Sequence, residues 1–187
     1  MKKFLAVLGI LFFSMSVCAE EVDYQQVYRD LEVPTLKYVH NIDPGEYYDT
    51  QNSTWSPYPL FRLTATLYFK SITIEPGYYL LTPREHKGSW YMLFKEGGKI
   101  KYIVPIYDRQ LVPLNFYDEN LPKAKLTPTQ KIHITLLDTI GKFIPSAKRK
   151  PTPQTYLEVV DLDNNFISLV VYWGNYKYFT IFRTIQL

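Results

Sequence analysis

Hydrophobic and polar residues alternate without a break between Phe61 and Lys70. The apolar members lie at every second position: Phe61, Leu63, Ala65, Leu67 and Phe69. In an extended chain, successive side chains point to opposite faces of the sheet. The pattern therefore predicts a strand over residues 61–70 that turns one face to a core and the other to water. After a Pro-Gly turn at residues 76–77, Tyr78 to Leu81 predicts a second strand.

Turn-forming residues separate further apolar runs. Three strand pairings follow from this arrangement: 90–94 with 100–106, 156–160 with 166–172, and 166–172 with 178–185. Their connections contain Gly97-Gly98, Asn164-Asn165 and Gly174-Asn175, which accept the positive φ angles of tight hairpin turns. The C-terminal third is thus predicted to be a three-stranded antiparallel meander. The alternation in Lys131 to Leu137 predicts one more strand.

Helical spacing is found at the start of the expected mature chain, where Tyr24, Val27, Tyr28 and Leu31 predict a short helix that ends before Pro34. Residues 40–59 have no clear period and are interpreted as a long ordered loop. About eight to ten strands with little helix predict an all-β fold, an antiparallel sandwich or small barrel with a short N-terminal helix.

The first 19 residues have the pattern of an export signal. Lys2 and Lys3 precede an apolar run over residues 4–13, and Val17-Cys18-Ala19 offers small side chains for cleavage. We therefore predict a signal peptide over 1–19, a single β domain over 20–187, and export to the periplasm or the cell surface. Lipoprotein anchoring at Cys18 is the weaker alternative, because Met15 and Val17 are poor residues before such a cleavage site. Cleavage after Ala19 removes the one cysteine and with it any disulfide or thiolate chemistry.

Charge limits the classes of partner. Removing Lys2 and Lys3 with the leader lowers the formal net charge from +3 to +1, which disfavours nucleic acid. The one basic cluster consists of Lys142, Lys148, Arg149 and Lys150. Its last three members predict a peripheral contact with anionic envelope lipid or polysaccharide, although a solvated loop explains them equally well.

No motif predicts a catalytic residue, a metal ligand or a cofactor. His40, His86 and His133 are far apart in the chain and show no metal-binding spacing. Asp161 to Asn165 begins like a calcium loop, but Phe166 and Trp173 stand where glycine and glutamate are needed, so a hairpin turn is favoured.

Aromatic residues make up 17% of the chain, and tyrosine is the most abundant of them with 17 residues. Tyrosine combines an apolar ring with a hydroxyl and suits half-buried or ligand-binding surfaces. The predicted ligand-binding residues are Tyr47, Tyr48, Trp55, Tyr58, Trp173 and Tyr176. Cross-strand packing within the sheets is the competing explanation for these rings.

Taken together, these patterns predict an exported, non-catalytic binding module of the cell envelope that holds a glycan, a lipid or a protein partner on an aromatic surface. A structural or accessory subunit of an envelope assembly is the first alternative. A hydrolase using Glu85, His86 and Asp108 is the second, and it lacks any recognisable motif.

Overall fold

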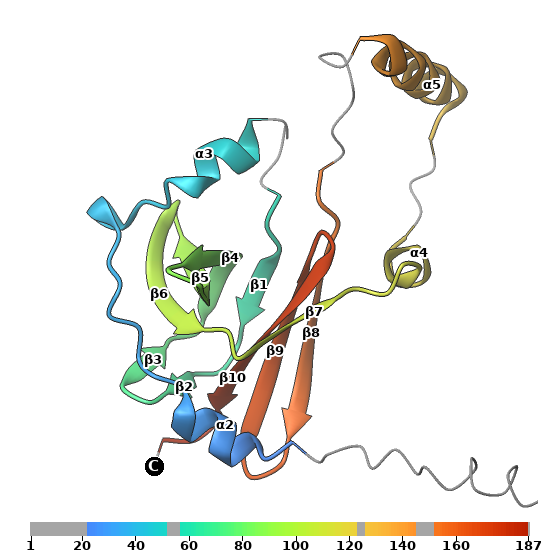
Figure 1. Cartoon of the computed structure of the whole chain (residues 1–187). Coiled ribbons are helices and arrows are strands. Elements are labelled where there is room, and N and C mark those ends of the chain that lie inside the picture. Colours follow the sequence, from blue (N-terminus) through green and yellow to red (C-terminus); the bar gives the residue numbers. More distant parts are fainter. Residues whose placement is uncertain (1–21, 52–56, 123–125, 145–151, 187) are drawn as a thin grey trace, which may run out of the picture.

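The computed structural model describes residues 22–51, 57–122, 126–144 and 152–186, which form ten strands in two antiparallel sheets with a few short helices (Figure 1). The two sheets make an all-β sandwich and do not close into a barrel. The predicted leader, Trp55 and the basic residues 148–150 lie outside the described residues.

The first sheet, sheet A, has the strand order β1-β4-β5-β6. Its strands are β1 (Leu60–Leu63), β4 (Gly77–His86), β5 (Ser89–Glu96) and β6 (Lys99–Pro105). The predicted hairpin of residues 90–94 and 100–106 is confirmed as β5 and β6. The turn between them places Gly97 and Gly98 at φ values of 57° and 78°, where a side chain would be strained.

The second sheet, sheet B, has the order β3-β2-β10-β9-β8, with β7 also paired to β10. Its strands are β2 (Leu67–Phe69), β3 (Ile72–Ile74), β7 (Asp108–Leu111), β8 (Thr155–Leu162), β9 (Phe166–Trp173) and β10 (Tyr176–Arg183). The predicted C-terminal meander is therefore confirmed. Asn164 and Asn165 adopt positive φ in the β8–β9 turn, as the turn interpretation requires.

The predicted strand over 61–70 is wrong in one respect, because the structure divides it into β1 and β2. Leu63 pairs with Gly77 in sheet A, whereas Leu67 pairs with Ile74 in sheet B. Leu63, Leu67 and Phe69 are buried, whereas Ala65 lies exposed in the bend between the two strands, so the alternation holds within the strands and is interrupted between them. Period two records which side chains point inward but not whether the chain changes sheet between them.

Aromatic and aliphatic side chains from both sheets form the core. Phe94 of sheet A and Phe182 of sheet B are fully buried, with their ring centroids 6.0 Å apart in an edge-on contact. The helix α2 (Tyr24–Asp30) confirms the predicted N-terminal helix. It covers one end of the sandwich, where Tyr28 packs on Phe69 and Phe166.

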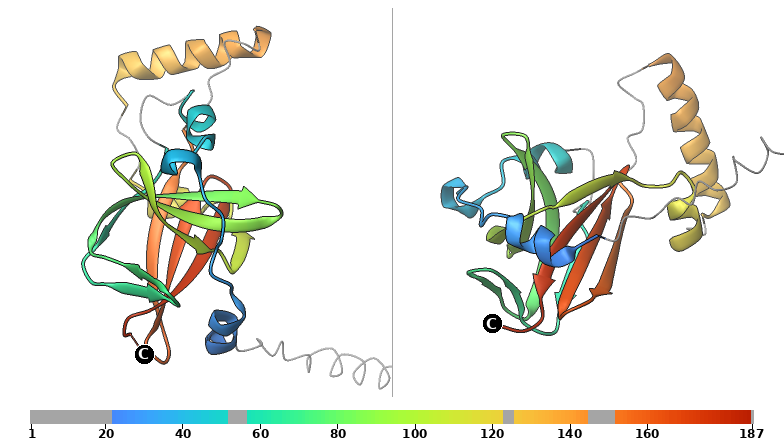
Figure 2. Two further views of the ribbon diagram at one scale, coloured as in Figure 1. Left: turned by 90° about the vertical axis from the view of Figure 1, so that its left-hand side faces the viewer. Right: turned by 60° about the horizontal axis from the view of Figure 1, so that its bottom comes forward.

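The strand predicted over 131–137 is wrong, because these residues lie within the helix α5 (Pro128–Phe143). Thr127 caps the helix through its hydroxyl, and Gln130 completes a capping box. Alternating residues over so short a run suit either period, and the capping signal decides for the helix. Together with α4 (Phe116–Asn120), α5 belongs to the excursion between β7 and β8, and it stands apart from both sheets in every view (Figures 1 and 2).

The segment interpreted as a loop contains a 3₁₀ turn, η1 (Val39–Asn41), and the helix α3 (Gly45–Thr50). Both lie beside sheet A at the end of the sandwich opposite α2 (Figures 1 and 2). None of the helices in the described ranges has the length and apolarity to cross a membrane.

Candidate binding surface

Two cations lie on the face of sheet A that is turned away from sheet B. Tyr79 of β4 and Phe94 of β5 point into the core. Successive side chains of a strand point to opposite faces, so residues an odd number of positions away along each strand point outward. Arg84 of β4 and Lys95 of β5 share this outer face. The side chain of Lys95 is only 1% exposed and that of Arg84 14% exposed. Charges this deeply buried need partners, because the loss of hydration destabilises them strongly.

The partners are carboxylates of the α3 segment. Lys95 Nζ donates to Asp43 Oδ2 at 2.6 Å and to Glu46 Oε2 at 3.0 Å. Arg84 Nε donates to the two Asp43 oxygens at 3.0 and 2.9 Å, and its Nη2 donates to Asp49 Oδ2 at 2.6 Å. Both cations therefore hold α3 against the sheet through charge-assisted hydrogen bonds.

Tyr58 completes this group of six residues, which we call the ionic cluster: Asp43, Glu46, Asp49, Tyr58, Arg84 and Lys95. The Tyr58 hydroxyl donates to Asp49 Oδ2 at 2.7 Å and accepts from Arg84 Nη2 at 2.9 Å. Its ring lies 4.7 Å from Lys95 Nζ, which is a cation–π distance. Tyr58 is 5% exposed, so it contributes to the surface by supporting α3 and not by offering an open ring.

The electrostatics keep Asp43 and Tyr58 in their ordinary ionisation states. Burial by itself raises the pKa of Asp43, but the hydrogen bonds and charges of Arg84 and Lys95 outweigh it and hold that pKa below its usual value. Burial raises the pKa of Tyr58, and its hydrogen bond to Asp49 adds to the effect. Asp43 is therefore an anion and Tyr58 a neutral phenol at neutral pH. Neither is poised to exchange a proton there, which suits a positioning role.

Gly45 allows the close approach of Arg84 to the start of α3. A Cβ at position 45 would lie 2.8 Å from Arg84 Nε, well inside contact distance. The Gly45 N–H also donates to Asp43 Oδ1 at 3.0 Å. The first turn of α3 thus fits directly over the guanidinium.

The surface that this arrangement displays carries two tyrosines. Tyr47 and Tyr48 of α3 are 68% and 70% exposed, and their rings meet edge-on at 5.4 Å. Val39 and Ile42, a few residues earlier, are exposed as well. Residues 39–48 therefore present apolar side chains to solvent, while carboxylates of the same segment bind Arg84 and Lys95 of sheet A.

No family model, curated protein or solved structure matches the chain.

The structure divides the predicted ligand-binding residues into separate groups. Tyr47 and Tyr48 are on the open surface, and Trp55 lies outside the described residues. Trp173, at the end of β9, packs 6.2 Å from the Tyr58 ring and donates its indole N–H to the Pro57 carbonyl at 3.1 Å.

Tyr176 is the cross-strand partner of Trp173, but its ring contacts other side chains. The Arg109 guanidinium lies between Tyr176 and Trp90, 4.4 Å and 4.6 Å from the two ring centroids. The ring of Tyr178 is 6.4 Å from that of Tyr176. Tyr176 therefore belongs to a cation–π stack that joins sheet B to Trp90 of sheet A, and Trp173 connects sheet B to the segment beneath α3.

The residues considered for a hydrolase lie on two different strands, β4 and β7. Glu85 and His86 are exposed at the end of β4. The Asp108 carboxylate accepts hydrogen bonds from Arg109 N and Gln110 Nε2 on its own strand. In the part of the chain that the structure describes, no hydrogen bond links these three residues, and no group of three His, Cys, Asp or Glu side chains is arranged to hold a metal ion.

Sequence reasoning missed five members of the ionic cluster: Asp43, Glu46, Asp49, Arg84 and Lys95. A local signal exists only for the carboxylates, since Asp43, Glu46 and Asp49 are spaced three apart over a Pro-Gly start that favours a helical turn. Their cations are separated from Asp43 by 41 and 52 residues, so nothing in the local pattern identifies them.

Proposed function

We propose that the protein is an exported, non-catalytic binding module of the cell envelope that holds a glycan, a lipid or a protein partner on the α3 surface. Tyr47 and Tyr48 are the central contacts of that surface. The observation that carries the proposal is the combination of two widely exposed tyrosine rings with a buried ionic cluster directly beneath them.

The ionic cluster beneath α3 favours a binding surface over two tyrosine rings that are merely exposed. Binding is weakened when flexible side chains or loops must be ordered in the complex. Tyrosine loses little conformational freedom because it has few rotatable bonds, and it offers both an apolar ring and a hydrogen-bonding group. A short helix held by Arg84 and Lys95 keeps both rings in place before a partner arrives.

Native mass spectrometry of the protein purified from an exporting host tests this proposal. We expect a bound glycan, lipid or protein, and the added mass distinguishes the three classes. The Tyr47→Ala/Tyr48→Ala double variant should lose the bound species by about tenfold or more, because central aromatic contacts dominate binding energies. Its melting temperature should stay close to that of the original protein, since both rings are exposed.

Tyr78→Ala provides the matched control. Tyr78 is also a widely exposed tyrosine, at 58%, but it lies at the start of β4 and contacts Arg62. We expect this variant to retain the bound species. Equal losses in both variants, or no bound glycan, lipid or protein in the original chain, would contradict the proposal.

The accessory-subunit alternative makes a different prediction for the same measurement. A protein partner of fixed stoichiometry whose binding survives the loss of Tyr47 and Tyr48 would favour a subunit that assembles through another surface.

A further inference from the structure

Helix α5 concentrates exposed apolar side chains. Among the described residues, six of the eighteen large hydrophobic side chains that are exposed lie within 126–144. Phe143 is 82% exposed, Ile132 68% and Leu136 54%. Gly141 is the one buried residue of the helix. A helix that packs on its own domain buries its apolar stripe, so this stripe is available for an external partner.

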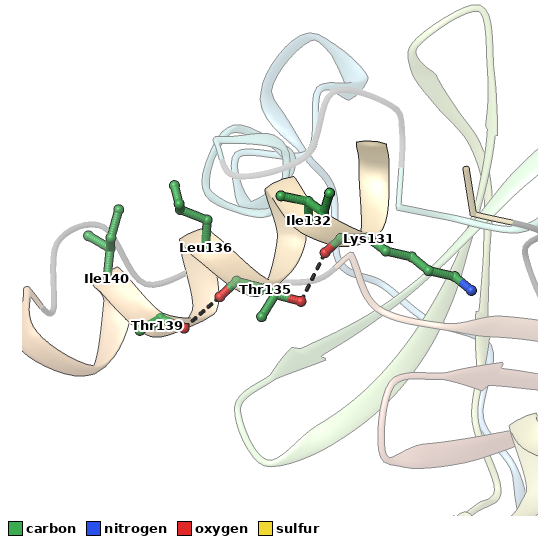
Figure 3. A pocket seen from close by; sticks show the side chains of 6 residues that line it. All are labelled: Lys131, Ile132, Thr135, Leu136, Thr139 and Ile140. Atoms are coloured by element: carbon green, nitrogen blue, oxygen red, sulfur yellow. Dashed lines mark hydrogen bonds between the residues drawn. The ribbon is translucent and has the colours of Figure 1, made fainter. Parts of the chain in front are cut away.

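The apolar side chains gather on one side of α5. Ile132, Leu136 and Ile140 are four residues apart and point to the same side of the helix, as Figure 3 shows. Phe143 continues the stripe at the C-terminal end because it follows Ile140 by three residues. Ile132, Leu136 and Ile140 line an open apolar depression of about 500 Å³, together with Lys131, Thr135 and Thr139.

The threonines beside the stripe are satisfied within the helix. Thr135 Oγ1 donates to the Lys131 carbonyl at 2.9 Å, and Thr139 Oγ1 donates to the Thr135 carbonyl at 2.7 Å (Figure 3). These hydroxyls need no water to donate their protons, which lowers the energy needed to bring this part of the helix into an apolar medium.

The charges in and directly after α5 indicate which apolar medium the helix binds. Lys131 and Lys142 lie on α5, and the sequence directly after it adds Lys148, Arg149 and Lys150. Asp138 is the only acidic residue between positions 126 and 150, so this stretch carries a net charge of +4 although the whole chain carries +3. We propose that α5 docks the protein on an anionic lipid surface, lying flat in the interface with Ile132, Leu136 and Phe143 toward the acyl chains.

An amphipathic helix with lysines and an apolar stripe is the element that binds lipid interfaces in this way. The 16 residues of α5 are too few to span a bilayer, which requires a helix of about 20 residues, so the helix lies on the surface and does not cross it. The position of α5, which stands apart from both sheets, lets the stripe reach a membrane without a change in the sandwich (Figure 2). This inference is independent of the α3 surface.

Vesicle co-sedimentation tests the docking. The protein is purified from an exporting host, and its N-terminus is established by mass spectrometry. Vesicles of phosphatidylcholine alone are compared with vesicles that also contain about one quarter phosphatidylglycerol, and we expect about tenfold stronger binding to the anionic vesicles, weakening as salt is added.

Two double variants separate the stripe from exposed apolar side chains elsewhere in the molecule. Leu136→Asn/Phe143→Asn removes apolar side chains without changing charge and should weaken binding to the anionic vesicles about tenfold. Leu111→Asn/Leu114→Asn makes the same number of changes at exposed leucines outside α5 and should stay within about twofold of the original protein. All four substituted side chains are exposed and outside the core, so both variants should keep the original melting temperature.

Several results would overturn the inference. These are no binding to either vesicle, equal binding to neutral and anionic vesicles, and equal loss in the two double variants. A dimer that dissociates in Leu136→Asn/Phe143→Asn would instead assign the stripe to a second copy of the chain. The Tyr47→Ala/Tyr48→Ala variant should retain vesicle binding, so a failure of this inference can be told apart from a failure of the proposed function.

Discussion

Asp43 is the carboxylate of the ionic cluster that contacts both buried cations. It accepts hydrogen bonds from Arg84, Lys95 and the Gly45 amide while its side chain is 1% exposed. A buried carboxylate with several cationic donors remains ionised because the donors replace its lost hydration. Asp43 thus shares with Glu46 and Asp49 the task of holding the α3 segment against sheet A.

At the residue scale we expect Asp43→Asn to lower the free energy of unfolding by about 3 kcal/mol at pH 7, because it leaves two buried cations undercompensated. The difference should shrink in acid. The pKa of Asp43 is lowered on folding, so its stabilising effect is complete above the pKa of the unfolded chain, about 4. The effect disappears as the pH falls through the folded-state pKa.

Urea unfolding of both proteins at neutral pH and at successively lower pH measures this prediction. Glu46→Gln is the control, since Glu46 is 32% exposed and bonds only to Lys95, and it should change stability less. A difference between the original chain and Asp43→Asn that stays constant down to strongly acidic pH would be inconsistent with an ionised Asp43 in the folded state.

The tyrosines show what can be predicted about a binding site from residue type alone. The sequence indicates that rings such as Tyr47, Tyr48 and Tyr58 are candidates for binding, and it treats them alike. Tertiary packing then separates them, because Tyr58 is covered and Tyr47 and Tyr48 are not. A ligand-binding ring on the surface could be removed with little loss of stability, but Tyr58→Ala should be destabilising because it removes a buried ring and its hydrogen bonds.

At the element scale, α5 is maintained by its own local interactions. Its capping box at Thr127 and Gln130 and the hydrogen bonds of Thr135 and Thr139 lie within the helix. An isolated helix of this length is marginal in water, so its caps have a large influence on its population. The sandwich, by contrast, gains almost no burial from α5.

We therefore expect Thr127→Ala to destabilise α5 by about 1 kcal/mol and to reduce the helical signal in far-UV circular dichroism. The unfolding midpoint of the sandwich, followed by tryptophan fluorescence from Trp90 and Trp173, should not move. Thr139→Ala is the matched control and should raise helicity slightly, because alanine is the better helix former at an interior position. A shift of the sandwich midpoint with Thr127→Ala would mean that α5 packs on the sheets.

The hairpins are the elements that the sequence predicts best. The glycine and asparagine turns and their flanking runs give β5, β6, β8, β9 and β10 with small errors at the ends. Turn residues and period two are local properties, so no distant contact is needed to interpret them. The wrongly predicted strand at 131–137 lacked such a turn signal, and its apolar residues fit a helix as well.

At the scale of the whole molecule, two sheets share one core. Phe94 and Phe182 come from different sheets, are fully buried and meet at 6.0 Å. The chain crosses from sheet A to sheet B between β1 and β2, so neither sheet is formed by a continuous part of the sequence. The two sheets should consequently unfold together.

We expect Phe94→Ala and Phe182→Ala each to lower the free energy of unfolding by about 3–5 kcal/mol, through lost burial and a cavity. The double variant should lose less than the sum, because the rings contact each other. Phe143→Ala removes the same side chain from the exposed stripe of α5 and should change stability by at most about 0.5 kcal/mol. Denaturant unfolding with fluorescence and circular dichroism measures all three. Two separate transitions would show that the sheets are independent.

The sequence by itself determined the features that depend on neighbours along the chain. These are the strand-rich class, the hairpin turns, the N-terminal helix α2 and the large supply of aromatic rings. Each follows from side-chain periodicity or from backbone preferences that act over a few residues.

Only the tertiary structure decided where the chain changes sheet, which tyrosines face solvent, and how buried cations on β4 and β5 meet carboxylates about 40 to 50 residues earlier. Burial and ion pairing depend on groups that are distant in sequence and adjacent in space. In the sequence, Lys95 is an ordinary polar residue at the end of a strand. The fold alone shows that the α3 segment covers it.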